Sequence, residues 1–194
     1  MSNTNTRKLT VIAMLSAISF VLSYPLFQFP LVPAADFLKI DFTILPILIG
    51  LFMYGISAGF AILIIRSILW LLLNNQGAST WIGLPMNFIA VAVFIVIFWL
   101  FLHRKFSIAN YILATAVGTI ALTVVMVILN YIYAIPLYSK FANFDISTMF
   151  PGGVSAYIIS VIFFNLLEGL IFAASFAILY WALRGSKAVK FVNQ

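Results

Sequence analysis

Long apolar runs, separated by short polar or proline-containing stretches, dominate the pattern along the chain. The runs are continuous and do not alternate between apolar and polar residues, which favours helices over the strands of a membrane barrel. The pattern predicts six helices, over residues 9–24, 42–54, 60–73, 81–102, 108–133 and 154–183. Since a helix crosses the hydrocarbon core with about 20 apolar residues, we predict an all-α membrane protein with six transmembrane helices.

The segment after the first predicted helix is interrupted by Pro25, Pro30 and Pro33. Prolines this close together exclude a regular helix, yet the segment is too apolar and aromatic for a loop in water. We therefore predict a re-entrant or lid-like loop that folds back over a cavity. Two further breaks are expected: a turn over residues 55–59, and a polar and aromatic loop over residues 136–153.

Composition supports a protein that lies almost wholly in the bilayer. The 194 residues are 65% hydrophobic and 7% charged, whereas a soluble domain carries about 25% charged residues. We expect one integral membrane domain over residues 1–194, with no room for a separate soluble catalytic domain. The absence of cysteine excludes disulfides, thiol catalysis and thiolate metal sites.

Basic residues set the orientation of a membrane protein, because short cytoplasmic loops are enriched in lysine and arginine. With six helices, most basic residues fall on one side of the membrane: Arg7, Lys8, Arg104, Lys105, Arg184, Lys187 and Lys190. We predict a multi-pass cell-membrane protein with both termini in the cytoplasm and with residues 25–41, 74–81 and 134–153 outside. The net charge of +6 then reports topology, and no nucleic acid is expected as a partner.

Catalytic groups are sparse. The only histidine, His103, adjoins Arg104 and Lys105 and is interpreted as an interfacial cation. The acidic residues do not cluster within the spans, so we expect no catalytic residue and no metal site. The glycine spacing of residues 50–55 is that of a nucleotide-binding loop, but the lysine that this motif needs is missing. The chain is therefore not expected to be an enzyme.

Several polar residues lie next to or inside the apolar runs. Lys39 and Asp41 directly precede the helix predicted over residues 42–54. Because a charge at the bilayer centre costs about 2.5–3.5 kcal/mol on insertion scales, we place both at the membrane boundary, facing a wet cavity. Three amides stand within apolar helices: Asn87, Asn130 and Asn165. Each must find a partner, which can be a ligand or a neighbouring helix.

Arg66 and Glu168 are the ionisable residues deepest in the predicted spans. One hypothesis pairs them as a structural ion pair. The other turns Glu168 toward the cavity, and it is favoured because Asn165 lies three residues earlier, on the same helical face.

Two small residues four positions apart, Ala13 and Ala17, allow another helix to approach closely. That helix can belong to this chain or to another subunit, and spacing alone favours a helix of the same bundle.

Several short motifs, in their order along the chain, resemble one family. They are Leu38-Lys39-Ile40-Asp41-Phe42 followed by Pro46, then Gly83 to Phe88, Asn130, and finally Phe164-Asn165-Leu-Leu-Glu168-Gly169. The chain resembles, over essentially its whole length, the substrate-binding S component of an energy-coupling-factor (ECF) vitamin transporter, most closely the riboflavin-specific type. The family usually has Lys where this chain has Glu168, and Pro where it has Phe163.

The resemblance implies a function and a set of partners. Riboflavin would be the transported substrate and not a cofactor, captured from the outer face for ATP-driven uptake. The partners would be a transmembrane coupling subunit, docking at Ala13 and Ala17, and two cytoplasmic ATPases. The lipid bilayer would surround the membrane subunits. The implied ligand-binding residues are Lys39, Asp41, Asn87, Asn130, Asn165 and Glu168.

Alternatives remain at this stage. Within the family, the vitamin could be pantothenate or a pyridoxine-like compound, because Glu168 inverts the local charge. From other classes, the alternatives are a membrane enzyme acting on lipids and a purely structural membrane subunit. The first would need clustered carboxylates or histidines, and the second would not need polar residues gathered at one membrane face.

Overall fold

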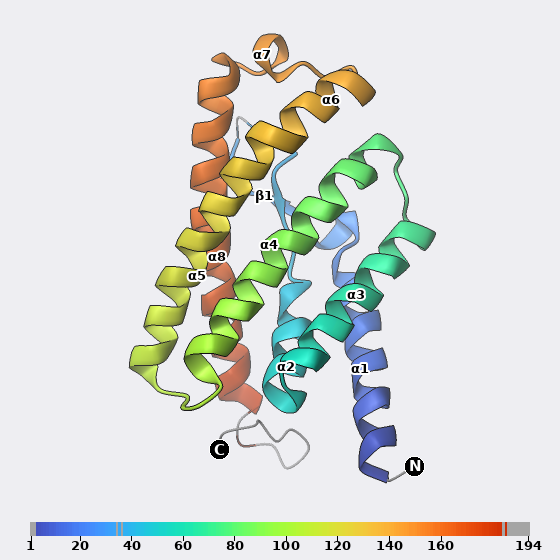
Figure 1. Ribbon diagram of the computed structural model, residues 1–194, viewed down its shortest axis with the longest axis vertical. Coiled ribbons are helices and arrows are strands. Elements are labelled where there is room, and N and C mark those ends of the chain that lie inside the picture. Colours follow the sequence, from blue (N-terminus) through green and yellow to red (C-terminus); the bar gives the residue numbers. More distant parts are fainter. Residues whose placement is uncertain (1–2, 34, 36, 184, 186–194) are drawn as a thin grey trace.

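The computed structural model describes residues 3–33, 35, 37–183 and 185, which form a bundle of helices (Figure 1). Its helices are α1 (Asn3–Leu22), α2 (Ile44–Tyr54), α3 (Ile56–Leu73), α4 (Ala78–Leu102), α5 (Ile108–Leu129), α6 (Ile135–Phe141), α7 (Ile146–Met149) and α8 (Gly153–Leu183). Five stretches are long and apolar enough to cross a membrane: Asn5–Leu22, Ile56–Leu73, Ala78–Leu102, Ile108–Phe141 and Gly153–Leu183. The predicted all-α membrane fold is confirmed.

The chain enters the first helix and leaves the last helix at the same end of the bundle. The N-terminal end of α1, the C-terminal end of α8 and the connection between α4 and α5 lie together at the bottom of Figure 1. Arg7, Lys8, Arg104 and Lys105 therefore share that end. Three other basic residues expected there, Arg184, Lys187 and Lys190, lie outside the described residues. We call this the basic end of the bundle and the opposite end the loop end.

The span predicted over residues 42–54 corresponds to α2, which is shorter than a bilayer is thick. Its 11 residues rise only about 16 Å at 1.5 Å per residue, against a hydrocarbon core of about 30 Å. The chain reaches α2 through a hairpin of two short antiparallel strands, β1 (Phe29–Pro30) and β2 (Lys39–Ile40), which lies inside the bundle (Figure 1). Non-helical backbone at membrane depth is tolerated where it is buried in protein or lines a wet cavity. The proline-rich lid-like loop is thus this hairpin.

The turn predicted over residues 55–59 is wrong in extent, because α3 already begins at Ile56. The reversal is made by Gly55 alone, whose φ of +88° is unfavourable for residues with a side chain. Gly59 lies inside α3, where a Cβ atom would come within 3.3 Å of Leu51 on α2. This glycine thus serves close helix packing and not a turn.

The loop predicted from Pro136 is also wrong at its start. The helix continues from α5 through one π-helical turn, Asn130–Ala134, into α6, and the loop begins only after Phe141. Pro136 falls in the first turn of α6, directly after the π-helical turn. The spacing of the helical hydrogen bonds changes there, and this accommodates a proline without an N–H. Because π turns within α-helices often occur at functional sites, the turn at Asn130 is a candidate position for a functional residue.

The half of the bundle toward the basic end is filled by stacked aromatic rings. Phe94 and Phe98 of α4 lie 4.4 Å apart between ring centroids, and Phe52 of α2 stacks on Phe176 of α8 at 5.2 Å. The four side chains are at most 4% exposed. Aromatic pairs of this geometry add about 0.5–1.5 kcal/mol beyond the area they bury. The centre of this half is therefore a tightly packed aromatic core.

Helix α1 turns its serines inward and its alanines outward. Ser19 Oγ donates a 2.7 Å hydrogen bond to the backbone oxygen of Thr43, which ties α1 to the start of α2, and Ser16 is also fully buried. Ala13 and Ala17 are exposed. The interpretation that these alanines receive a helix of the same bundle is therefore wrong, because the inward face of α1 is the serine face.

Candidate ligand-binding site

Three adjoining cavities lie in the half of the bundle toward the loop end. Their volumes are about 280, 460 and 210 Å³, and all three are lined by Phe37 and Lys39. We refer to them together as the outer cavity. Its walls come from the hairpin, from α3 and α4 on one side, and from the α5–α6 segment and α8 on the other. Ligand sites typically occupy about 300–1,000 Å³, so this space suits a small molecule.

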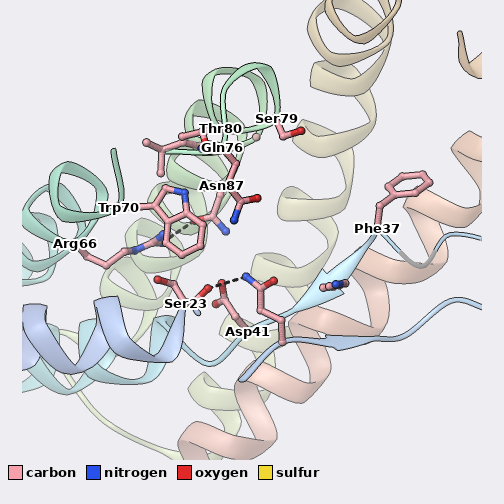
Figure 2. Close-up of a pocket in the computed structure, with 13 residues that line it drawn as sticks. Ser23, Phe37, Asp41, Arg66, Trp70, Gln76, Ser79, Thr80 and Asn87 are labelled. Carbon is pink, nitrogen blue, oxygen red and sulfur yellow. Dashed lines mark hydrogen bonds between the residues drawn. The ribbon is translucent and has the colours of Figure 1, made fainter. Parts of the chain in front are cut away.

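The wall formed by α3 and α4 contains a buried cation. Arg66 of α3 is 2% exposed, and its Nη2 donates a 2.6 Å hydrogen bond to Oδ1 of Asn87 on α4. Figure 2 shows Arg66, Trp70 and Asn87 grouped on one side of the cavity, with Phe37 on the other. A charged side chain at this depth is costly in a membrane protein and marks functional pathways.

The hairpin contributes polar groups to the floor of the cavity. Asp41 Oδ1 accepts hydrogen bonds from Thr43, at 3.0 Å from the backbone nitrogen and 2.6 Å from the hydroxyl, and so fixes the start of α2. Gln28 is held by a 2.8 Å bond from Nε2 to the backbone oxygen of Ser23. Lys39 is exposed and lines all three cavities. As predicted, Lys39 and Asp41 face a cavity.

The opposite wall is aromatic and centred on Asn130. The Tyr157 hydroxyl of α8 donates to Asn130 Oδ1, and Asn130 Nδ2 donates to the backbone oxygen of Met126 at 2.7 Å. Phe37 stacks on Tyr157 with ring centroids 6.1 Å apart and planes inclined by 28°. The π-helical turn thus presents Asn130 beside a stack of flat rings, a setting that favours a flat aromatic ligand.

Glu168 lies on the same wall as Asn130 and lines one cavity with it, Lys39 and Asn87. The hypothesis of an ion pair between Glu168 and Arg66 is not supported. Arg66 donates to Asn87, the two residues line different cavities, and no salt bridge joins these two described side chains. The cavity-facing hypothesis for Glu168 agrees with this geometry. With Lys39 and Arg66 as cations and Asp41 and Glu168 as acids, the formal charges of the outer cavity balance.

Asn165 is placed differently from the other two amides. It is 1% exposed, its Nδ2 donates to the backbone oxygen of Val161 at 2.7 Å, and its Oδ1 has no partner among the described residues. It lies outside the lining of the three cavities. Phe163, where the family usually has Pro, is 54% exposed and is likewise not part of that lining. The structure therefore brings five of the six predicted ligand residues together.

Sequence reasoning missed several aromatic residues of the site, among them Phe37 and Tyr157. Tyr157 precedes Phe164 by seven residues and Glu168 by eleven, and all three line one cavity. These intervals place residues on one face of a helix, so the spacing was a usable signal. Phe37 had only its position two residues before Lys39 to indicate a role.

What the site can do chemically follows from these groups. Within the described residues, no group of three or more histidine, aspartate or glutamate side chains could hold a metal ion. The lining combines amides, balanced charges and aromatic rings, which together bind a small, flat, hydrogen-bonding molecule without covalent chemistry. The geometry is that of a binding site.

Comparisons with known proteins agree with the assignment of a small-molecule binding site. The chain matches the family described as "ECF transporter, substrate-specific component" over residues 7–180. It is 54% identical to the riboflavin transporter RibU of Streptococcus thermophilus, over 93% of this chain and 84% of that protein. It is 45% identical to the riboflavin transporter RibU of Lactococcus lactis, over 97% of this chain and 98% of that protein.

A solved structure extends the similarity to three dimensions. It is described as the structure and mechanism of the S component of a bacterial ECF transporter, and it superposes with a TM-score of 0.76 at 28% identity. The alignment covers 92% of this chain and 96% of that one. A transport component is not an enzyme, so the lipid-enzyme alternative is set aside. The chain belongs to the family of substrate-specific components of ECF transporters.

Proposed function

We propose that this chain captures riboflavin in the outer cavity and delivers it for ATP-driven uptake. The observation that carries the proposal is the identity of 54% over 93% of the chain with a protein named riboflavin transporter. The site adds chemical support. An isoalloxazine ring needs apolar faces and hydrogen bonds at its edges, and Phe37, Tyr157 and Asn87 supply both kinds of contact at one cavity.

The proposed ligand-binding residues are Lys39, Asp41, Asn87, Asn130 and Glu168, all of which line the outer cavity. Asn165 stays a prediction of the family resemblance, without a cavity contact to support it. We further propose that the basic end of the bundle is cytoplasmic. The four described basic residues there are those that the positive-inside rule assigns to the cytoplasm, and the outer cavity then opens toward the outside.

Fluorescence titration tests the ligand. Purified protein should quench the fluorescence of riboflavin saturably, because a bound flavin would stack on the aromatic lining. Pantothenate and a pyridoxine-like compound serve as competitors. Saturable binding of one of them, with no quenching of riboflavin, would replace riboflavin by that vitamin while leaving the family unchanged.

We propose that a transmembrane coupling subunit docks on α1 at Ala13 and Ala17, and that two ATPases complete the transporter. Both alanines are exposed on the outward face of α1, where small residues allow another helix to approach closely. Replacing both by Trp should abolish vitamin uptake and co-purification with the coupling subunit, while ligand affinity is retained. Ala174→Trp, at an exposed alanine of α8, is the matched control. Normal uptake by the double variant would reject this docking surface.

A further inference from the structure

The three amides near the outer cavity differ in what their hydrogen-bonding groups already contact. Asn130 uses both ends, accepting from Tyr157 and donating to Met126. Asn165 donates within its own helix and lies outside the cavity lining. Asn87 uses only Oδ1, which accepts from Arg66, and its Nδ2 has no acceptor among the described residues. Asn87 lines two of the three cavities.

The orientation of the Asn87 amide is fixed by the chemistry of its partner. A guanidinium group carries only donors and has no acceptor. The atom of Asn87 that lies 2.6 Å from Arg66 Nη2 must therefore be the carbonyl oxygen. An asparagine without such a neighbour can turn its amide by half a turn and present either an acceptor or a donor. Next to Arg66, only the N–H side remains for the cavity.

The environment of Arg66 indicates a role beyond linking α3 to α4 through a hydrogen bond. Its side chain is 2% exposed and its Nε has no partner among the described residues. A neutral donor could join α3 to α4 at less cost, because a charge at membrane depth is expensive and is usually functional. Asp41 lines the same cavity and supplies the opposite charge. A guanidinium placed here has a property that a hydroxyl or a side-chain amide lacks, because it can only donate hydrogen bonds.

We propose that Arg66 is a positioning residue that makes Asn87 a hydrogen-bond donor to the ligand. The Asn87 N–H group then selects a ligand with an acceptor, a ring nitrogen or a carbonyl oxygen, on the edge of a flat heterocycle. This inference rests on the proposed function, since it concerns the same cavity. It specifies the direction of one hydrogen bond: on the α3–α4 wall the protein donates and the ligand accepts.

Asn87→Asp separates positioning from a structural tie. The carboxylate keeps a partner for Arg66 and so keeps α3 joined to α4, but it has no N–H group to offer. We expect thermal stability to be retained and riboflavin affinity to fall about 5- to 150-fold, the range for a lost buried hydrogen bond that leaves its partner unsatisfied. Asn75→Asp, on the exposed connection between α3 and α4, adds the same charge away from the cavity and should leave affinity unchanged. Undiminished affinity in Asn87→Asp would overturn the proposal.

A double-mutant cycle tests whether Arg66 acts through Asn87. Riboflavin affinity is measured for Arg66→Met, Asn87→Leu and the double variant, each checked for folding by its melting temperature. We expect each single change to weaken binding and the double variant to bind no more weakly than Asn87→Leu, because Arg66 has nothing to orient once the amide is gone. Losses that add in the double variant would show that Arg66 acts independently and would reject the proposal.

The two levels of inference fail in different ways. If the unmodified protein binds no riboflavin but binds another vitamin saturably, the proposed function falls, and the same variants measured with that vitamin still test Arg66. If the unmodified protein binds riboflavin and Asn87→Asp binds it equally well, the function stands and the role of Arg66 falls. Should Arg66→Met fail to fold, Asn87→Asp alone decides, because it retains the buried cation and a partner for it.

Discussion

The two halves of the bundle are built from the same helices but serve opposite purposes. On α4, Gly83 and Asn87 line the outer cavity, whereas Phe94 and Phe98 fill the half toward the basic end. On α8, Glu168 lines the cavity, and Phe176, two turns further along, stacks in the aromatic core. Each of these helices thus passes from lining a polar cavity to packing in an apolar core within about two turns.

This difference shows how a small membrane protein can hold a hollow site. An open, partly polar cavity contributes little apolar packing of its own, so the bundle must be held together elsewhere. The aromatic stacks lie toward the basic end. The close contact between α5 and α8, at Gly169 and Thr119, lies near the middle of both helices, one residue past Glu168 of the cavity lining. We therefore expect substitutions in the filled half to change stability, and substitutions in the hollow half to change affinity.

The largest effect is expected in the aromatic core. Phe98 is fully buried, stacks on Phe94 and meets Tyr111 edge to face at 5.7 Å. Phe98→Ala should lower the free energy of unfolding by about 3–5 kcal/mol through lost contacts and a residual cavity. Thermal unfolding in detergent measures it, with the exposed Phe163→Ala as control. Riboflavin affinity of the folded fraction should not change, and a selective loss of affinity would contradict the division into halves.

A second stability effect is expected where α5 and α8 meet. A Cβ atom on Gly169 would lie 2.4 Å from Thr119 Oγ1 and 2.8 Å from its Cγ2. Gly169→Ala should therefore destabilise the protein by about 1–3 kcal/mol through overpacking. Thr119→Ala removes these two atoms but keeps Thr119 Cβ, 2.9 Å from the added Cβ, so it should restore only part of the loss. Gly83→Ala, where no atom lies within 4 Å, is the control for stability. Equal melting temperatures of all variants would show that this contact is loose.

The acidic residue that replaces the family lysine should produce a moderate change in affinity. Glu168→Gln keeps the shape of the side chain and replaces its carboxyl group at the cavity wall by an amide. We expect riboflavin affinity to fall about fivefold, corresponding to about 1 kcal/mol for one altered hydrogen bond, with little change in melting temperature. A clear loss of stability that Arg66→Met relieves would instead indicate that Glu168 and Arg66 pair.

The smallest effect on affinity is expected at Asn165, in contrast to Asn130. Asn130→Leu strands the Tyr157 hydroxyl at the cavity wall and should weaken binding clearly. Asn165→Leu should change riboflavin affinity by less than about 0.5 kcal/mol, roughly twofold, because Asn165 lies outside the cavity lining. Isothermal titration of both variants makes the comparison. A loss at Asn165 equal to that at Asn130 would restore the ligand role that the family resemblance implies.

The sequence by itself determined the class of the protein. Uninterrupted apolar runs can satisfy their backbone groups in lipid only as helices, so the membrane bundle and most helix positions followed from composition and pattern. The order of short motifs around Lys39, Asn87 and Glu168 indicated the family, which the comparisons confirm. These properties are local, because each depends on neighbouring residues of one segment.

Only the tertiary structure decided the roles of individual residues. Pro136 did not end its helix, because the π-helical turn directly before it accommodates the proline at the start of α6. Ala13 and Ala17 face outward because the serine face of α1 is held by α2.

The amides show the same limit most clearly. Asn87, Asn130 and Asn165 look alike in sequence, each a polar residue in an apolar run. Their roles diverge because Arg66 donates to the first and Tyr157 donates to the second, whereas the third donates to the backbone of its own helix. The hydrogen-bonding capacity left for a ligand depends on partners that are 21 or 27 residues distant along the chain, and helical periodicity carries no information over such separations.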